Sequence, residues 1–183
     1  MSTALSELTG TYTIDPAHTR IGFSARHAMV TKVRGAFNEF SGTAKVDGDE
    51  PGRSSVEVRI ATASIDTRNE QRDGHLRTGD FLEVEKYPEI TFASTAVERV
   101  SDTTFRITGD LTIKGVTKPV TIDFEFEGAA KDPFGNERIG FEGSTSINRS
   151  DFGVTFNAAL ETGGVLVSEK INLEFEVSAI RNA

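Results

Sequence analysis

The stretch Val120-Thr121-Ile122-Asp123-Phe124-Glu125-Phe126-Glu127 decides the fold, because its apolar and polar side chains alternate without a break. Successive side chains of a β-strand point to opposite faces, so this alternation predicts a strand with one buried and one solvated face. Strands of parallel sheets are covered on both faces and are unbroken apolar runs instead. The pattern therefore favours an antiparallel sheet.

The same two-residue period recurs along the whole chain. Together with the turn-forming residues that separate the periodic stretches, it predicts about eight long strands, over residues 19–27, 32–47, 54–66, 89–99, 103–113, 118–129, 137–147 and 167–180. A short first strand is expected near residues 11–14. A bulge is expected at Asn38–Glu39, because the apolar residues change parity there. Turns are expected at 47–52, 100–103, 115–119 and 132–136, which implies a meander of hairpins.

One segment departs from the alternation. Residues 68–78 are rich in charged side chains and lack the two-residue period, which predicts a short helix with Thr67 as its N-cap. The polar makeup of this segment favours a lid or plug over a core helix.

The length of 183 residues indicates one domain over 1–183, with residues 1–10 as a loose N-terminal segment. Lys and Arg number 20 against 28 Asp and Glu, and the net charge of -8 disfavours a nucleic-acid surface and a basic membrane patch. The absence of Cys excludes disulfides, thiolate nucleophiles and Cys-ligated metal sites.

Membrane and export signals are not evident in the sequence. Its apolar runs are far shorter than the roughly 20 residues that a spanning helix needs, so no transmembrane segment is predicted. The first ten residues lack the basic start and apolar stretch of an export signal, which leads us to expect a cytoplasmic protein.

Strands with one apolar face can form two packed sheets or one sheet closed into a barrel. Closure removes the edges, and a barrel of about eight strands either holds one small ligand or is filled by its own side chains. The sequence has 13 Phe and no Trp. Many of these rings follow the apolar period, and they are Phe23, Phe37, Phe92, Phe105, Phe124, Phe126, Phe141 and Phe175. Periodicity alone leaves open whether they pack a core or line a lumen.

Familiar catalytic motifs do not occur in the sequence. It has no G-x-S-x-G elbow, no phosphate-binding loop, no G-x-G-x-x-G and no H-E-x-x-H, and its histidines lack zinc-ligand spacing. His27 continues the apolar period and should face inward near a strand end, either as a buried, hydrogen-bonded residue or in contact with a polar ligand head group. An enzyme that uses His27 or His75 with a nearby carboxylate is the alternative function.

Seven different stretches, in order along the chain, form a characteristic set of motifs. They are 14–23 with His27, 35–42, 64–67, 72–81, 87–92, 109–120 and 148–154. Among them are Ile14-Asp15-Pro16-Ala17-His18-Thr19-Arg20, Arg72-Asp73-Gly74-His75-Leu76-Arg77-Thr78-Gly79-Asp80-Phe81 and Asn148-Arg149-Ser150-Asp151-Phe152-Gly153. In this order they resemble the YceI-like family of lipocalin-like polyisoprenoid-binding proteins, over about residues 11–180. His18 is followed by Thr19 where Ser is common in the family, a change that keeps the hydroxyl.

This resemblance implies an all-β fold: an extended eight-stranded antiparallel up-and-down barrel, lipocalin-like, with the helical insertion near one end. It implies noncatalytic binding, storage or transport of a polyprenyl phosphate, quinone or similar isoprenoid lipid, with no other cofactor and no metal. Relatives often form dimers, so a homodimer is a further expectation. The implied lumen residues are Phe23, His27, Phe37, Phe40, Ile60, Phe92, Ile107, Leu111, Phe124, Phe141 and Phe175. Candidates for contacting the lipid head group are Arg68, Arg72, Arg77 and Arg149, because a guanidinium binds phosphate well.

Overall fold

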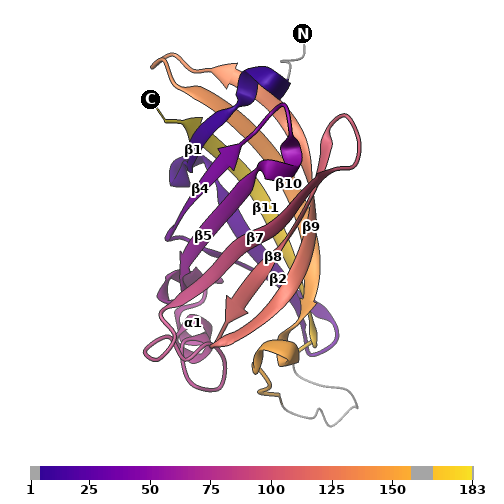
Figure 1. Cartoon of the computed structure of the whole chain (residues 1–183). Helices are drawn as coiled ribbons and strands as arrows, with labels where there is room; N and C mark the ends of the chain where they lie inside the picture. Colours follow the sequence, from indigo (N-terminus) through magenta and orange to yellow (C-terminus); the bar gives the residue numbers. More distant parts are fainter. Residues whose placement is uncertain (1–4, 158–166, 183) are drawn as a thin grey trace.

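The computed structural model describes residues 5–157 and 167–182. These residues form a closed antiparallel β-barrel of eight strands (Figure 1). The strand segments are β1 (Gly10–Ile14), β2 (Arg20–His27), β3 (Thr31–Phe37), β4 (Phe40–Val46), β5 (Ser55–Ala61), β6 (Ile65–Asp66), β7 (Glu89–Arg99), β8 (Thr104–Ile113), β9 (Val116–Lys131), β10 (Glu137–Asn148) and β11 (Lys170–Arg181). The helical segments are η1 (Leu5–Leu8), η2 (Pro16–His18), η3 (Pro51–Arg53), η4 (Thr62–Ser64), α1 (Glu70–Leu76) and η5 (Arg149–Phe152).

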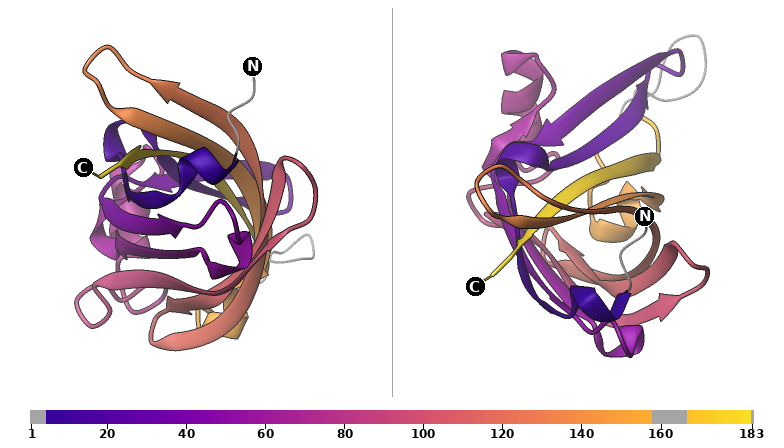
Figure 2. Two further views of the ribbon diagram at one scale, coloured as in Figure 1. Left: turned by 45° about the horizontal axis from the view of Figure 1, so that its top comes forward. Right: turned by 90° about the horizontal axis from the view of Figure 1, so that it is seen from above.

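Pairing between the first and last strands closes the sheet. Around the barrel the strand order is β1-β4-β5-β7-β8-β9-β10-β11, and β11 then pairs with β1. β2 lies on the same edge of β11 as β1, so these two segments form one long strand that is interrupted by η2. β3 with β4, and β5 with β6, are likewise broken strands. Figure 2 shows the strands arranged around a common axis.

The predicted strands are confirmed, including the short first strand and the irregularity at Asn38–Glu39, which separates β3 from β4. The alternation in β9 also has the predicted consequence. Thr121 is exposed, whereas Ile122 between the polar residues is buried, with 5% of its surface exposed. The register of the sheet therefore directs the charged side chains of β9 outward and its apolar side chains inward.

Three local predictions are wrong. The turn expected at 115–119 is a tighter turn at Lys114 and Gly115, because residues 116–119 already belong to β9 and pair with β8. Asn69, not Thr67, caps α1, and its side chain accepts a hydrogen bond from the backbone N–H of Arg72. Residues 1–4 of the segment expected to be loose lie outside the described residues, but residues 5–10 are held in place: Leu8 is buried in a core cluster, and the Tyr12 hydroxyl donates to the Leu8 carbonyl at 2.8 Å. The apolar side chain of Leu8 anchors this segment across the end of the barrel.

An ion-pair network ties two loops together at the end of the barrel where η2 lies. Arg138 donates to the carboxylates of Asp15 and Asp132, each at 2.7 Å. These hydrogen bonds from Arg138 are the main cause that lowers the pKa of each carboxyl group from its ordinary value of 3.8 to about 2. The network joins the η2 interruption to the turn between β9 and β10.

Asp substitutions at two neighbouring positions of β9 test the assignment of faces. We expect Ile122→Asp to lower the free energy of unfolding by roughly 3 kcal/mol or more, because it removes a buried apolar group and buries a carboxylate. Thr121→Asp on the outer face should change it by less than about 1 kcal/mol. Denaturant unfolding measures both values. Equal damage from the two substitutions would refute the register.

Acid titration tests the Arg138 network. Because the pKa values of Asp15 and Asp132 are depressed in the folded state, their contribution to stability is present above pH 4 and is lost as the pH falls towards 2. Arg138→Met should therefore lower the unfolding free energy at pH 7 much more than at pH 2. A difference between the two proteins that stays constant over this range would contradict the role given to Arg138.

Candidate functional site

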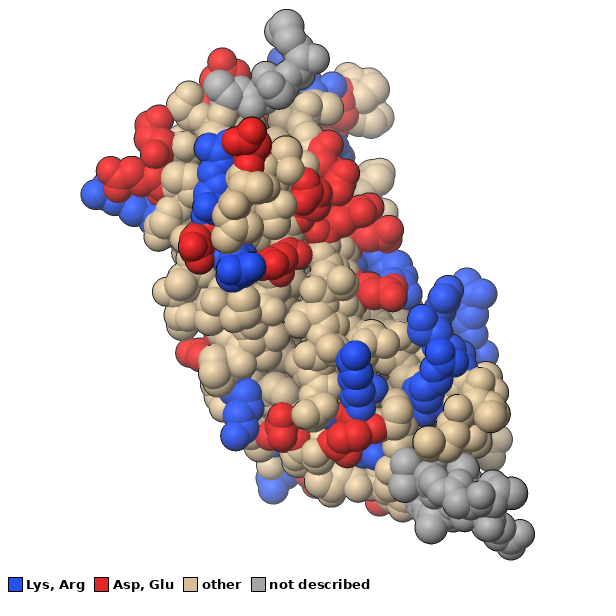
Figure 3. Space-filling model, turned by 90° about the vertical axis from the view of Figure 1, so that its right-hand side faces the viewer, with Lys and Arg blue, Asp and Glu red and all other residues tan. Residues whose placement is uncertain are grey.

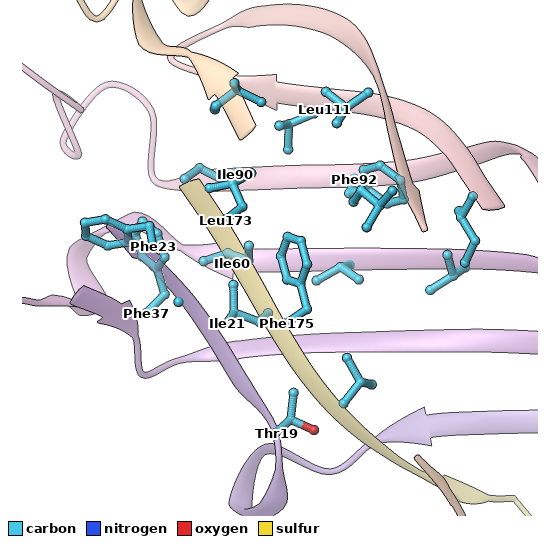
Figure 4. Close-up of a pocket in the computed structure, with 18 of the residues that line it drawn as sticks. Thr19, Ile21, Phe23, Phe37, Ile60, Ile90, Phe92, Leu111, Leu173 and Phe175 are labelled. Carbon is cyan, nitrogen blue, oxygen red and sulfur yellow. The ribbon is translucent and has the colours of Figure 1, made fainter. Parts of the chain in front are cut away.

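The inner face of the barrel encloses a cavity of about 460 Å³. Its lining is almost entirely apolar and comes from all around the barrel, as Figure 4 shows for part of the wall. The cavity reaches from Leu8 of η1 at one end to His75 of α1 at the other. Its volume lies within the range of about 300–1,000 Å³ that is typical of ligand pockets. The barrel is therefore hollow, which resolves the choice that the sequence left open.

Glycines beside the inward Phe rings help to keep the lumen open. Phe124 of β9 pairs directly with Gly143 of β10, and a Cβ atom on this glycine would lie 2.6 Å from the Phe124 ring. Phe23 and its cross-strand partner Gly35 show the same relationship, with a corresponding distance of 2.4 Å. In both pairs the ring occupies the space that a side chain on the neighbouring strand would take. These rings therefore lie against the wall and leave the axis of the barrel free.

The cavity lining contains all but one of the predicted lumen residues, namely Phe23, His27, Phe37, Ile60, Phe92, Ile107, Leu111, Phe124, Phe141 and Phe175. The exception is Phe40, which packs against the core cluster that contains its cross-strand partner Ile60. Phe40 is the first residue of β4, directly after the break at Asn38–Glu39. The break displaces the chain at this point, which parity alone does not reveal.

Several lining residues come from segments without regular alternation. None of them was expected in the lumen from the sequence, and they include Phe81, Phe152, Val154 and Phe156. Turns carry no two-residue period, so no signal in the sequence shows which of their side chains face inward. Further strand residues such as Val58 and Leu173 also line the cavity, and their positions on the apolar period could have identified them.

Three aromatic rings gather at the α1 end of the cavity. The rings of His75, Phe81 and Phe156 lie 5.1–5.2 Å from one another between centroids, with edge-on geometry. His75 Nε2 lies 2.8 Å from a carboxylate oxygen of Asp80. All three rings line the cavity, so this end combines an apolar surface with one polar, hydrogen-bonded imidazole.

Buried polar contacts fix α1 to the barrel. Asp73 is buried and accepts hydrogen bonds from the backbone N–H and the hydroxyl of Thr67. Arg72 donates through Nε to the Thr67 hydroxyl and through a terminal nitrogen to the Thr67 carbonyl, both at 2.7 Å. Arg72 also lines the cavity, as predicted for a head-group contact. Satisfied buried polar groups of this kind hold the helix in one position at the end of the lumen.

Arg149 is the most deeply buried of the predicted head-group arginines, with 5% of its surface exposed. Its guanidinium donates to the carbonyls of Val154 and Ser168 at 2.8 Å and to that of Val167 at 3.3 Å. No carboxylate lies within ion-pair distance among the residues that the structure describes, and burial lowers the pKa of the guanidinium. Arg149 lines the cavity, so it places a positive charge beside an apolar lumen, and Glu169 is close enough to interact with it electrostatically.

The other two predicted head-group arginines do not line the cavity. Arg77 donates to the carbonyls of Ala63 and Ile65, at 3.0 and 3.3 Å, and so braces the segment before α1. Arg68 has a positive φ of 64° in the turn before α1, where its backbone N–H donates to Asp66. Arg68 and Arg77 therefore lie outside the lumen, although they are close to Arg72 in the sequence.

Within residues 5–157 and 167–182, no group of three or more His, Asp or Glu side chains is arranged to hold a metal ion. No helix in the same ranges is long and apolar enough to cross a membrane.

The closed meander, the hollow apolar lumen and helix α1 at one end of the barrel together define a lipocalin-like barrel. A family model described as the YceI-like domain matches residues 12–179, and the chain belongs to this family. The Staphylococcus aureus (strain MSSA476) relative named UPF0312 protein SAS2572 is 38% identical over 169 residues, which cover 92% of this chain and 95% of that protein.

Solved structures share the architecture. Burkholderia cenocepacia BcnA superimposes with a TM-score of 0.80 at 25% identity, over 90% of this chain and 98% of that chain. The Campylobacter jejuni YCEI protein gives a TM-score of 0.75 at 34% identity, over 86% and 90%. A polyisoprenoid binding domain from Saccharophagus degradans gives 0.71 at 14% identity, over 93% and 98%, and this likeness concerns the fold alone.

Two glycines of β10 offer a test of how the lumen stays open. We expect Gly143→Ala to push the Phe124 ring off the wall, to cost about 1–3 kcal/mol of unfolding free energy and to reduce the binding of an apolar fluorescent probe. Gly140→Ala is the control, because the nearest atoms to its added Cβ would lie 3.8 Å away. If both variants bind the probe like the parent protein, the ring at Phe124 does not limit the lumen.

Proposed function

We propose that the chain binds a long-chain isoprenoid lipid in its lumen and stores or carries it without changing it chemically. The observation that supports this proposal best is the hollow cavity of about 460 Å³ with its almost entirely apolar lining. Burial of an apolar chain stabilises a complex by about 25 cal/mol per Å² without regard to the chemistry of that chain. The name of the Saccharophagus degradans domain, a polyisoprenoid binding domain of the same fold, supports an isoprenoid as the tail.

The shape of the cavity favours an elongated ligand. The strands β7, β8, β10 and β11 have 10–12 residues each, which corresponds to roughly 34–41 Å of extended strand at about 3.4 Å per residue. The lining continues from one end of these strands to the other. A polyprenyl phosphate or a quinone with a long tail fits this geometry better than a compact ligand does.

We place the polar end of the ligand at the α1 and η5 end of the lumen. Arg149 and Arg72 line the cavity there, and a guanidinium has five N–H donors. Three nitrogens of Arg149 each bind one backbone carbonyl, so two N–H groups remain for an oxygen of the ligand. An anionic or carbonyl head would also help to compensate this buried charge, which forms no close ion pair with the described residues and interacts with Glu169 only at longer range.

The His75–Asp80 pair is the observation that favours the alternative of an enzyme. A hydrogen bond to a carboxylate orients an imidazole for acid–base chemistry, and His75 faces the cavity. His27 also lines the cavity, but in the described part of the chain its side chain makes no hydrogen bond. A lipid that is bound to the parent protein and to the His75→Gln variant tests this alternative. If the role is noncatalytic, the lipid is recovered chemically unchanged from both proteins.

Trp substitutions at two neighbouring positions of β5 test the carrier function. Val58 lines the cavity, whereas Glu57 is exposed on the outer face. We expect the parent protein and Glu57→Trp to retain a polyprenyl lipid in native mass spectrometry. Val58→Trp should lose it or bind only shorter tails, because the indole fills the lumen. The absence of any copurified lipid, together with no uptake of added polyprenyl phosphate or quinone by the parent protein, would overturn the proposal.

A further inference from the structure

The turn between β2 and β3 exposes two apolar side chains at the tip of a hairpin. Met29 is 59% exposed and Val30 is 77% exposed, although large apolar side chains elsewhere on the barrel mostly face inward. The hairpin projects beyond the ring of strands in the view from above (Figure 2). Exposed apolar groups at a projecting tip contribute little to the core and are available to contact a partner outside the protein.

The backbone of this turn is strained, which adds an independent observation. A hydrogen bond from Val30 N–H to the His27 carbonyl closes the turn, and its two central residues Ala28 and Met29 have positive φ angles of 51° and 68°. Tight hairpin turns with two positive φ angles favour Asn-Gly, because a Cβ atom makes this conformation unfavourable. The chain has Ala and Met at these two positions instead. These residues make the tip apolar, although Asn-Gly would stabilise the turn better.

Basic side chains flank the tip on the outer face of the hairpin. Arg26 lies directly opposite Lys32 and also borders the cavity, and Arg34 is the next outward residue along β3. All three are exposed, and none of them forms an ion pair with any residue that the structure describes. Figure 3 shows Lys and Arg gathered on this side of the molecule. The net charge of -8 led us to expect no basic membrane patch, but the whole-chain sum does not describe this face.

The inner side of the same hairpin belongs to the lumen. His27 and Val33 line the cavity close to the turn, and Val167, which bridges to His27, lines it as well. The apolar tip, the basic outer face and the rim of the lumen are therefore within one hairpin. This arrangement places part of the cavity wall next to whatever surface the tip contacts.

We propose that the β2–β3 hairpin docks on the surface of an anionic lipid bilayer. Met29 and Val30 enter the apolar boundary of the bilayer, while Arg26, Lys32 and Arg34 contact lipid phosphates. Apolar side chains beside cations are the combination that binds such interfaces, since each contributes a separate part of the affinity. Docking on the bilayer does not depend on the carrier function. The exchange of lipid between the bilayer and the lumen, which docking would allow, rests on that proposed function.

Sedimentation with vesicles tests the docking. We expect the protein to bind phosphatidylcholine vesicles that contain phosphatidylglycerol at low ionic strength, and to release them as salt is added. Vesicles of phosphatidylcholine alone should bind it far less. Lys32→Gln and Arg34→Gln should each weaken binding about fivefold. No sedimentation with the anionic vesicles would overturn the proposal.

A double variant, Ala28→Asn with Met29→Gly, separates docking from folding. It introduces the preferred turn sequence, so thermal unfolding should occur at the same temperature or a higher one, while vesicle binding falls about tenfold or more. Phe134→Ser is the control, because Phe134 is 88% exposed in the turn at the opposite end of the barrel. Unchanged binding by the double variant, or equal loss in the control, would overturn the proposal.

Three further outcomes assign a failure to the correct hypothesis. A dimer in size-exclusion chromatography that the double variant abolishes would assign the tip to self-association and overturn docking. A protein that contains lipid in native mass spectrometry but does not bind vesicles would refute docking alone. A protein that binds vesicles but never takes up lipid would refute the carrier function alone.

Discussion

The pairing of β1 with β11 is the constraint on which the rest of the structure depends. Tyr12, Thr13 and Ile14 pair with residues 179–181, so the chain closes on itself and its first and last strands leave no long free edge. Once the sheet is closed, each side chain faces either the lumen or the solvent. A register shift of one residue would move the Phe side of every affected strand to the solvent and its charged side into the lumen.

Closure alone does not make a barrel hollow, because its inner side chains could meet at the axis. The difference lies in how the aromatic rings are placed. Phe23 and Phe124 lie over Gly35 and Gly143 of the neighbouring strands, so much of each ring contacts the wall. The same number of rings without these glycines would extend further towards the axis. A ligand chamber thus follows from pairing large residues with residues that have no side chain.

The two ends of the barrel differ in chemistry. At one end η1 packs onto the barrel, and Arg138 joins two loops through carboxylates with depressed pKa values. At the other end the buried guanidinium of Arg149, the α1 contacts and the β2–β3 hairpin lie around the cavity. The first end is built for stability. The second combines polar groups, an apolar tip and the rim of the lumen, as expected for the end that meets a ligand and its source.

The sequence by itself determined the strands, their inner and outer faces and most of the lumen residues, because a period of two is a local property of an extended chain. The break before Phe40 and the inward side chains of the loops were decided by the tertiary structure, since irregular backbone has no period. The arginines illustrate the same limit. Arg68, Arg72 and Arg77 are neighbours in the sequence, but packing of α1 against the barrel directs Arg72 to the lumen and leaves the other two outside it. Whether a closed sheet is full or hollow depends on contacts between strands, and no single strand contains that information.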